Sequence, residues 1–309
     1  MLDVKRMRVL REVISRGSFS GAAEVLHLSQ SAVSQQVASL EKEVGMQLLE
    51  RTSEGPKLTS AGETLMGHAD AVLCRLDEAE RELSEIAGLQ GGRVRVVSFP
   101  SASATVVTRA ISIFRQRFPA IELELGEDEP EESIPALRAG EYDIALSFDF
   151  SGHPGEVGRD LERSLLLEER MWVALPVGHP LGAAETVRLE ELADEEWLCG
   201  RSGSCRDHVV RLCQDAGFEP EVSFDSDDYQ VLKGLVSAGL GVTLLPELAL
   251  ADRPPGVELR AIADKPATRR VWAVTREGPV RSPATDAMLG VLIEAGRDYE
   301  TDVAEAIAA

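Results

Sequence analysis

Apolar residues recur at helical spacing in the segment from Ser18 to Gly45. Those in its second half are separated by four, three and four residues, namely Val33, Val37, Leu40 and Val44. This spacing places them in one stripe along a helix and predicts that the stripe is buried. Ser29 stands just before the helix as its expected N-cap. The opposite face carries small and polar residues, which are Ser31, Gln35, Ala38 and Lys42, with Ser34 on its flank.

A shorter amphipathic segment, residues 21–26, precedes this helix across a four-residue turn. Two helices at this spacing are typical of a helix-turn-helix, whose second helix enters the major groove of DNA. The alternative is a pair of ordinary surface helices. The segment after Gly45 favours DNA binding, because it predicts a strand over 48–52, a turn over 54–56 and a strand over 57–59, which together form the wing of a winged helix.

Residues 22–62 carry a family resemblance. The strings AAEVLHLSQSAVSQQVASLEKEVGMQLLERT and KLTSAG resemble the N-terminal domain of LysR-type transcriptional regulators. The resemblance implies a winged helix-turn-helix that binds double-stranded DNA. The outward helix face and the family's contact positions together identify the expected DNA-binding residues, which are Ser29, Gln30, Ser31, Ser34, Gln35, Arg51 and Lys57. The helix residues are expected to meet bases or nearby phosphates, and the two wing cations the DNA backbone.

Residues 60–87 are predicted to form one long helix with a regular apolar seam. Its apolar residues recur at alternating steps of four and three, and they are Leu65, Ala69, Val72, Leu76, Ala79, Leu83 and Ile86. A heptad seam of this kind pairs helices. The alternative is that the seam packs against the chain's own domain. The resemblance implies a linker helix that forms a homodimer or homotetramer, with interface residues Leu65, Val72, Leu76, Leu83 and Ile86.

Strands and helices alternate beyond the segment GLQGG at 88–92, which we interpret as a break between domains. Strands are predicted over 94–98, 121–125 and 144–148, and helices over 104–117 and 133–139. This order is typical of a parallel α/β sheet. A second α/β unit is predicted from Leu165 onward. A late strand over 269–275 is expected to return to the first unit, before a closing helix over 282–299.

Three further strings, LRAGEYDIALSF, PVGHPL and GLGVTLLPELA, resemble the effector domains of the same family. The resemblance implies the two-lobed, Rossmann-like fold of type II periplasmic binding proteins. The expected fold class is therefore α/β, with an all-α, winged-helix N-terminal domain. The expected boundaries are 1–59 for the DNA-binding domain, 60–87 for the linker helix and 88–309 for the effector domain. Lobe I comprises 91–164 and 268–309, and lobe II comprises 165–267, with crossings near Leu165 and over 263–268.

The net charge of −21 is unevenly distributed along the chain. Residues 1–60 contain eight Lys or Arg and seven Asp or Glu, whereas residues 61–309 contain 24 and 46. A DNA-binding domain with so little positive charge predicts modest, salt-sensitive affinity per subunit, which an oligomer would raise. The sequence shows neither an apolar run of membrane-spanning length nor a signal peptide at its start. We therefore expect a cytoplasmic protein with no membrane partner.

Ligands of doubly wound folds bind beyond the carboxyl ends of strands, near helix N-termini. Two loops occupy such positions, SFPSAS at 98–103 and GRSGSCRD at 200–207. With two rim positions, they supply the expected effector-binding residues, which are Ser98, Ser101, Ala102, Ser103, Phe148, Arg201, Ser202 and Asp227. Any one serine could instead cap its helix, and Arg201 could pair with a surface acid.

The sign of the effector stays open at this point. Hydroxyls beside Arg201 favour a small organic anion. The acidic run GEDEPEE at 126–132 favours a cation instead, unless it is a solvated loop, as charge runs usually are.

The remaining candidate chemistry points away from catalysis. The five His have no nucleophile or acid at recognisable spacing, and the sequence has no GxGxxG and no P-loop. Its four Cys form no CxxC pair, so we expect neither a metal site nor a cofactor. Cys205 and Cys213 lie where peroxide-sensing members of the family carry a reactive pair. Their spacing of eight is narrower than that of the sensors and argues against a redox role.

The sequence therefore predicts a LysR-type transcriptional regulator, modulated by a small molecule bound between the lobes, with RNA polymerase as a further candidate partner. The chief alternative is a binding or transport protein that uses the two-lobed fold alone. Such a protein would have no use for residues 1–87. An enzyme would need a catalytic constellation that the sequence does not contain.

Overall fold

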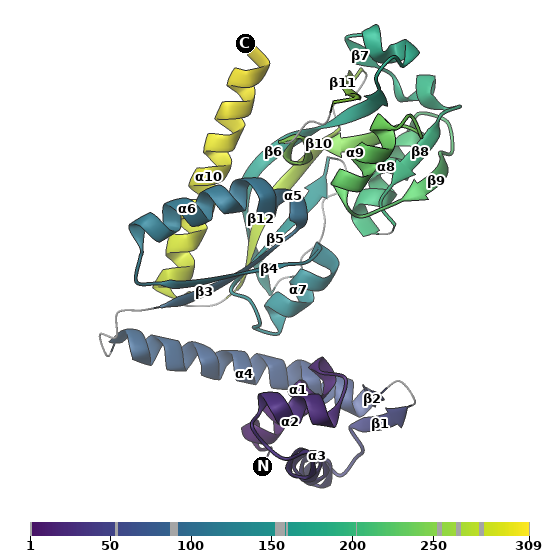
Figure 1. Cartoon of the computed structure of the whole chain (residues 1–309). Helices are drawn as coiled ribbons and strands as arrows, with labels where there is room; N and C mark the ends of the chain where they lie inside the picture. The colour runs from purple at the N-terminus through teal and green to yellow at the C-terminus, as the bar shows by residue number, and fades with distance from the viewer. Residues whose placement is uncertain are drawn as a thin grey trace. The chain divides into compact units, whose positions relative to one another are not determined.

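The computed structural model describes residues 2–308 apart from 53–54, 87–91, 152–157, 159, 202, 252–254, 264–266 and 278–280. Of residues 51, 74, 77, 78, 80–86 and 303–308 it describes the backbone only. The chain forms two compact units, one mainly of residues 1–90 and the other mainly of residues 91–309 (Figure 1). Among the described residues, no helix is both long enough and apolar enough to cross a lipid bilayer.

Three helices and a two-stranded hairpin make up the N-terminal unit as far as residue 58. In chain order they are α1 (Val4–Ser15), α2 (Phe19–Val25), α3 (Gln30–Val44), β1 (Leu49–Thr52) and β2 (Gly55–Leu58). The predicted stripe of α3 is confirmed, because Val33, Val37 and Leu40 are buried and Val44 packs at the edge of the same core. The strands β1 and β2 pair antiparallel, which confirms the winged helix.

Side-chain caps fix where α2 and α3 begin. The hydroxyl of Ser29 accepts a hydrogen bond from the N–H of Ala32 at 3.1 Å, as expected of an N-cap. The hydroxyl of Ser18 accepts from the N–H of Gly21 at 3.0 Å, so α2 begins at Phe19, two residues before the predicted segment. Both helices therefore start where a short polar side chain satisfies an otherwise unpaired N–H.

The long helix α4 (Ser60–Ile86) is one element, as predicted, but the first part of its seam has a different role. Leu65 and Ala69 are buried in the core of the N-terminal unit. The expected role of Leu65 in dimerisation is therefore corrected, because its side chain is only 9% exposed and already packed. Packing against the chain's own domain, the alternative interpretation of the seam, applies to these first turns.

The later positions of the seam differ from the first. Val72 and Leu76 are 42% and 41% exposed, although each follows a buried apolar residue, Ala69 or Leu73, by three positions. The other two dimerisation candidates, Leu83 and Ile86, belong to the part of α4 whose side chains lie outside the described residues. Dimerisation through α4 accordingly remains a prediction that depends on the second half of the seam.

The first part of the C-terminal unit alternates between strands and helices, as predicted. In order it contains β3 (Arg93–Ser98), α5 (Pro100–Ala102), the π-helical turn η1 (Ser103–Val107), α6 (Thr108–Arg117), β4 (Glu122–Glu127), α7 (Pro130–Arg138) and β5 (Ile144–Phe150). The strand β3 pairs parallel with both β4 and β5, which confirms the parallel sheet of lobe I. In η1 the hydroxyls of Thr105 and Thr108 donate to the carbonyls of Ser101 and Ser103.

The rest of the unit completes a larger, mixed sheet. Its elements are β6 (Leu161–Pro176), η2 (Pro180–Ala183), β7 (Thr186–Val187), η3 (Leu189–Leu192), β8 (Glu196–Cys199), α8 (Gly203–Asp215), β9 (Glu221–Asp225), α9 (Tyr229–Ser237), β10 (Thr243–Pro246), η4 (Glu247–Leu250), β11 (Val257–Ile262), β12 (Thr268–Arg276) and α10 (Pro283–Ala308). The strand order is β4-β3-β5-β12-β6-β11-β7, with β10 also on β6 and with β8 and β9 as a separate parallel pair. Neither β7 nor β11 is among the elements expected from the sequence.

The long strand β6 connects the two lobes. Up to Arg170 it pairs antiparallel with β12, and from Met171 onward with β10 and β11. The change of partner thus comes a few residues after the predicted crossing at Leu165. The strand β12 also pairs with β5, so the late strand does return to the first lobe, as expected.

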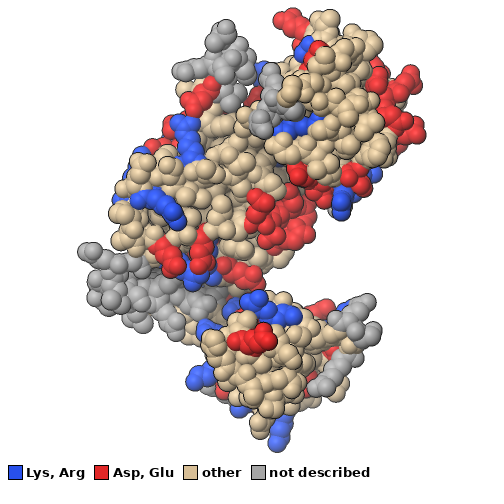
Figure 2. All heavy atoms as spheres, in the orientation of Figure 1, with Lys and Arg blue, Asp and Glu red and all other residues tan. Residues whose placement is uncertain are grey.

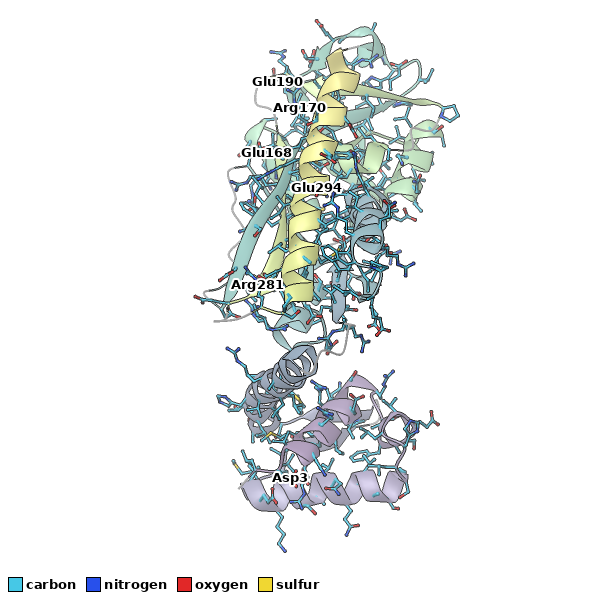
Figure 3. All side chains as sticks on the ribbon, turned by 90° about the vertical axis from the view of Figure 1, so that its left-hand side faces the viewer. Asp3, Glu168, Arg170, Glu190, Arg281 and Glu294 are labelled. Atoms are coloured by element: carbon cyan, nitrogen blue, oxygen red, sulfur yellow. The ribbon has the colours of Figure 1, made fainter. Side chains whose placement is uncertain are left out.

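The closing helix α10 lies along the sheet (Figure 3). At Gly296 it comes so close to β6 that a Cβ atom would lie 2.3 Å from the carbonyl oxygen of Leu166. Glu294, on the same helix, forms a bidentate ion pair with Arg117 of α6, with N···O distances of 2.5 and 2.6 Å. The absence of a side chain at Gly296 therefore allows the helix to pack tightly on the strand that joins the lobes.

Substituting Gly296 tests this close approach. Gly296→Ala should lower the free energy of unfolding by about 1–3 kcal/mol, because a strand carbonyl cannot move aside without disturbing the sheet. Gly290→Ala on the same helix is the control, since nothing lies within 4 Å of its added Cβ. That variant should be neutral or more stable by up to about 1 kcal/mol. Equal stabilities of the two variants in urea unfolding would contradict the close contact.

Candidate functional site

The outward face of α3 carries most of the predicted DNA-binding side chains. Gln30, Ser31 and Gln35 are exposed, and Ser34 is half-buried. The hydroxyls of Ser29 and Ser31 lie 3.0 Å apart at the start of the helix. Because the opposite stripe of α3 is buried, these polar side chains are held outward on a rigid element.

The wing is anchored to the same helix. One carboxylate oxygen of Glu41 accepts the N–H groups of Leu48 at 2.9 Å and Leu49 at 3.3 Å, which fixes the start of the hairpin. Lys57 in β2 is exposed on the wing. Arg51 lies in β1, but its side chain is outside the described residues, so its contact with DNA stays a prediction.

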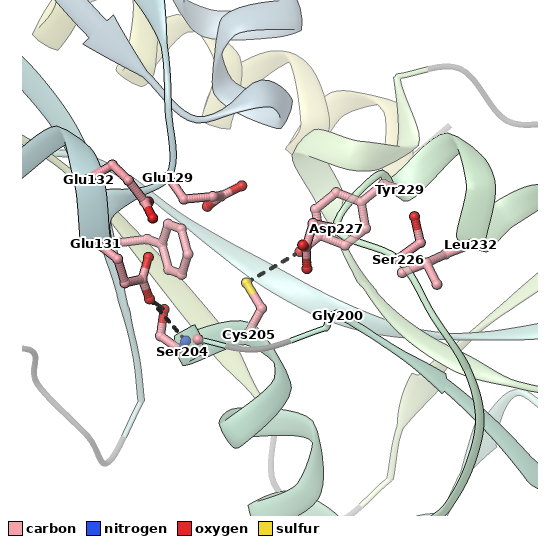
Figure 4. A pocket seen from close by; sticks show the side chains of 12 residues that line it. Glu129, Glu131, Glu132, Gly200, Ser204, Cys205, Ser226, Asp227, Tyr229 and Leu232 are labelled. Atoms are coloured by element: carbon pink, nitrogen blue, oxygen red, sulfur yellow. Dashed lines mark hydrogen bonds between the residues drawn. The ribbon is translucent and has the colours of Figure 1, made fainter. Parts of the chain in front are cut away.

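A cavity of about 240 Å³ opens in the C-terminal unit beyond the carboxyl ends of β4, β8 and β9 (Figure 4). Lobe I lines it with Glu129, Glu131, Glu132 and Phe148. Lobe II lines it mainly with Gly203, Ser204, Cys205, Asp227, Tyr229 and Leu232. Phe148 and Asp227 are two of the predicted effector-binding residues, and the position agrees with the general rule for ligands of doubly wound folds.

The loop at 98–103 uses its side chains internally. Ser98, Ser101, Ala102 and Ser103 are all buried, and none of them is among the residues that line the cavity. Ser98 and Ser103 donate their hydroxyls to backbone carbonyls at 3.3 and 3.4 Å. The hydroxyl of Ser101 accepts a hydrogen bond from Arg269 at 3.1 Å. The expected effector contacts of this loop stay a prediction, and its three hydroxyls take part in hydrogen bonds within the fold.

Arg269, which the sequence analysis does not single out, is a buried cation beside this loop. The sheet register places it opposite Glu169, and its Nε donates to a Glu169 oxygen at 2.7 Å, with both side chains only 1% exposed. The other Glu169 oxygen accepts the N–H of Leu248 at 2.7 Å. The guanidinium carbon also lies 4.9 Å from the ring centroid of Phe148. This buried ion pair thus contacts Ser101 in lobe I, Leu248 in lobe II and a wall of the cavity.

The second predicted loop contributes differently from what was expected. Arg201 is exposed and is not among the residues that line the cavity, so its expected role as a clamp for an anion stays a prediction without support from the cavity. Its backbone N–H donates to a carboxylate oxygen of Asp227 at 2.8 Å. Ser202 lies outside the described residues.

A carboxylate of the chain itself occupies the N-terminus of α8. One oxygen of Glu131 accepts both the N–H of Ser204 at 3.1 Å and its hydroxyl at 3.2 Å (Figure 4). Gly203 makes room for this contact, since a Cβ there would lie 2.9 Å from the same oxygen and the residue has a φ of 78°. An acid from lobe I thus satisfies the helix end of lobe II, where an anion would otherwise bind.

The cavity is acidic. Acidic side chains gather on the face of the C-terminal unit shown in Figure 2, over the region of α7. Burial, together with the neighbouring carboxylates of Glu131, Asp227 and Glu132, raises the pKa of Glu129 to about 7, although Arg269 opposes the shift. The run at 126–132 is therefore not simply a solvated loop, because it spans the end of β4 and the start of α7 and three of its acids line the cavity.

Two of the cysteines considered for redox chemistry lie on α8. Cys205 and Cys213 are eight residues apart, or roughly 12 Å along the helix axis, which is too far for a disulfide while the helix is intact. Burial raises the pKa of Cys205 to about 11 and that of Cys213 to about 12. Both thiols are therefore protonated at neutral pH, in which form they are poor nucleophiles.

The contact between Glu131 and Ser204 makes a specific prediction. Glu131→Ala should lose about 0.5–2 kcal/mol of stability through the unpaired helix end, offset in part by weaker repulsion among the acids. Acetate should restore the loss by filling the vacated position, whereas chloride at the same ionic strength should not. The control is Glu132→Ala on the same turn, which should not respond to acetate. If thermal unfolding shows equal acetate effects in wild type and Glu131→Ala, the carboxylate does not have this role.

Comparison with known proteins agrees with this architecture. Residues 4–63 match the bacterial regulatory helix-turn-helix protein family, lysR type, and residues 87–297 match the LysR substrate binding domain. The transcriptional dual regulator GltC of Bacillus subtilis (strain 168) is 31% identical over 277 residues, covering 89% of this chain and 91% of GltC.

Solved structures share the fold as well. A cysteine mutant of OxyR from Corynebacterium glutamicum, in its H2O2-bound form, has a TM-score of 0.61 at 27% identity and covers 99% of this chain and 98% of its own. Full-length OxyR from Pseudomonas aeruginosa, also a cysteine mutant, has a TM-score of 0.72 at 24% identity, covering 96% and 95%. The relatives are regulators of transcription. The chain therefore belongs to the LysR family of transcriptional regulators and is not an enzyme.

Proposed function

We propose that this regulator binds specific DNA sequences through the outward face of α3 and through the wing. The observation that carries the proposal is the exposed row of Gln30, Ser31 and Gln35 on a helix whose opposite face is buried. Amide and hydroxyl side chains of this kind hydrogen-bond base edges in the major groove. Lys57 on the wing supplies a phosphate contact that does not depend on sequence.

The protein acts as an oligomer in this proposal, with α4 as the interface. Val72 and Leu76 are exposed apolar residues on one side of the helix, and a second copy of α4 would bury them. Two DNA-binding units held together in this way raise the overall affinity, which compensates for the small positive charge of each unit. The proposed DNA binding supports a location in the cytoplasm, with RNA polymerase as a candidate partner on the bound DNA.

The cavity between the lobes is the proposed effector site. Groups from both lobes line it, with Phe148 from lobe I and Tyr229 and Leu232 from lobe II. A ligand that contacts both lobes favours the arrangement in which they are closest, and so shifts the population of conformers. Through the linker helix such a shift would change the spacing of the two DNA-binding units, and with it the bend of the DNA they hold.

Substitution of the outward face of α3 tests the proposed readout. In gel shifts with DNA from upstream of the protein's own gene, Gln35→Ala should relax sequence preference, at a cost of about 1–3 kcal/mol on the cognate base pair. Lys57→Ala should instead weaken all sequences alike and reduce the dependence on salt. Identical preference profiles for wild type and Gln35→Ala would remove Gln35 from the readout. Absence of any binding at low salt would contradict the proposed function itself.

A charge on the exposed part of α4 tests the interface. Leu76→Asp should dissociate the oligomer, because the carboxylate would have to be desolvated between two helices. Ala71→Asp is the matched control, since Ala71 is exposed on another side of the same helix. Light scattering at micromolar concentration distinguishes the two variants. A native oligomer in Leu76→Asp would show that α4 is not the main interface.

A further inference from the structure

Two groups of hydrogen-bond donors that could hold an anion near the cavity, those of Ser204 and of Arg269, are already used by the chain itself. The N–H and the hydroxyl of Ser204 bind Glu131. Arg269 donates one N–H group to the hydroxyl of Ser101 and another to Glu169, whose carboxylate neutralises the guanidinium. An anionic effector would therefore have to displace a carboxylate that is tethered in place, and would do so beside other acids.

Several carboxylate groups, which accept hydrogen bonds, line the cavity instead. Glu129, Glu132 and Asp227 line it, and no ion pair within the described part of the chain includes any of the three. Figure 4 shows Glu129 and Glu132 on one side of the cavity and Asp227 and Tyr229 on the other. The ring of Phe148 supplies apolar wall between them. We propose that this cavity selects an effector with a compact cationic group, such as a protonated amine, on a small apolar body.

The electrostatics of Glu129 explain why a cation fits. Its carboxylate is partly withdrawn from water and lies near the like charges of Glu131, Asp227 and Glu132, so the positive charge of Arg269 compensates its ionised form only in part. A cation placed between Glu129 and Asp227 would supply further compensation, and the aromatic ring of Tyr229 would favour the same charge. Binding of the cation would relieve the repulsion among the acids of the empty cavity, and this relief adds to the affinity for the effector. This inference rests on the proposed function, because it names the class of ligand for the same effector site.

Three ligands with one ring and different charges test the inference on the full-length protein. They are benzylamine, benzyl alcohol and benzoate, and binding is followed by ligand-observed NMR and calorimetry up to about 10 mM, a range suited to ligands of this size. Benzylamine should bind about tenfold or more tightly than either of the others. Absence of benzylamine binding in this range, or binding no tighter than that of benzyl alcohol, would overturn the inference.

The dependence on pH separates a contact with Glu129 from a general effect of the acidic surface. The charged or titratable groups around Glu129 are Glu131 and Glu132 on α7, Asp227 before α9, Arg269 on β12, and the cavity residues Cys205 and Tyr229. Glu129 is ionised above its pKa of about 7, so benzylamine affinity should rise up to about tenfold from about pH 6 to about pH 8. Glu129→Gln should lower the affinity and remove this rise. Glu185→Gln, at an exposed acid outside the cavity, should change neither.

A further substitution distinguishes failure of the ligand class from failure of the site. Glu132→Trp places a large ring at the mouth of the cavity and should abolish benzylamine binding, whereas Glu132→Gln should only weaken it. One outcome would be that benzoate is the best ligand of wild type and that Glu132→Trp abolishes its binding. The effector site would then stand, and its cationic preference would be wrong. If benzylamine binds equally well to Glu132→Trp, the ligand lies elsewhere, and the proposed location of the effector site is wrong as well.

Discussion

The geometry of the effector domain depends on one buried ion pair between neighbouring strands, Arg269 and Glu169. Breaking such a pair by removing one partner typically costs about 3–5 kcal/mol, because the other charge is left buried without compensation. Burial raises the pKa of Glu169, while the adjacent guanidinium and the N–H of Leu248 oppose that shift. The two side chains therefore stay paired, and the strands that carry them, β12 and β6, are held next to each other.

The position of the pair gives it influence over both lobes. It lies where β12 and β6 run side by side just before β6 changes partners. Phe148 connects it to the cavity, because the ring lies 4.9 Å from the guanidinium and packs edge-on against Phe99 at a centroid distance of 4.9 Å. A ligand that displaced Phe148 would thus act on the strands that join the lobes, and not only on the wall of the cavity.

Sequence periodicity predicts the elements well, because burial of one face is a local property of a helix or strand. The stripe on α3 and the cap at Ser29 are of this kind, whereas the cap at Ser18, which starts α2 two residues earlier than expected, was not predicted. The cavity, in contrast, is formed by residues that are far apart in the sequence. Its acids come from a run near residue 130 and from Asp227, almost a hundred residues later, and only the fold brings them together. Nothing in the run itself distinguishes a cavity wall from a solvated loop.

The buried ion pair has a recognisable pattern in the sequence. Glu169 falls in phase with the buried Leu167 and Met171 along β6, and Arg269 in phase with Val271 along β12. Opposite charges at buried positions of two alternating strands predict a cross-strand pair. The serines of the loop at 98–103 carried no comparable signal, because a hydroxyl that caps or bonds internally has the same sequence pattern as one that binds a ligand.

The contact between Glu131 and Ser204 also limits which small molecules can bind at the start of α8. The two residues lie 73 positions apart in the sequence, and the fold holds the carboxylate beside the helix end, so its presence there does not depend on the composition of the cell. A free carboxylate can occupy the same place only by displacing Glu131. The Glu131–Ser204 contact therefore shields the start of α8 from the small anions around the protein, because the chain supplies its own carboxylate at that position.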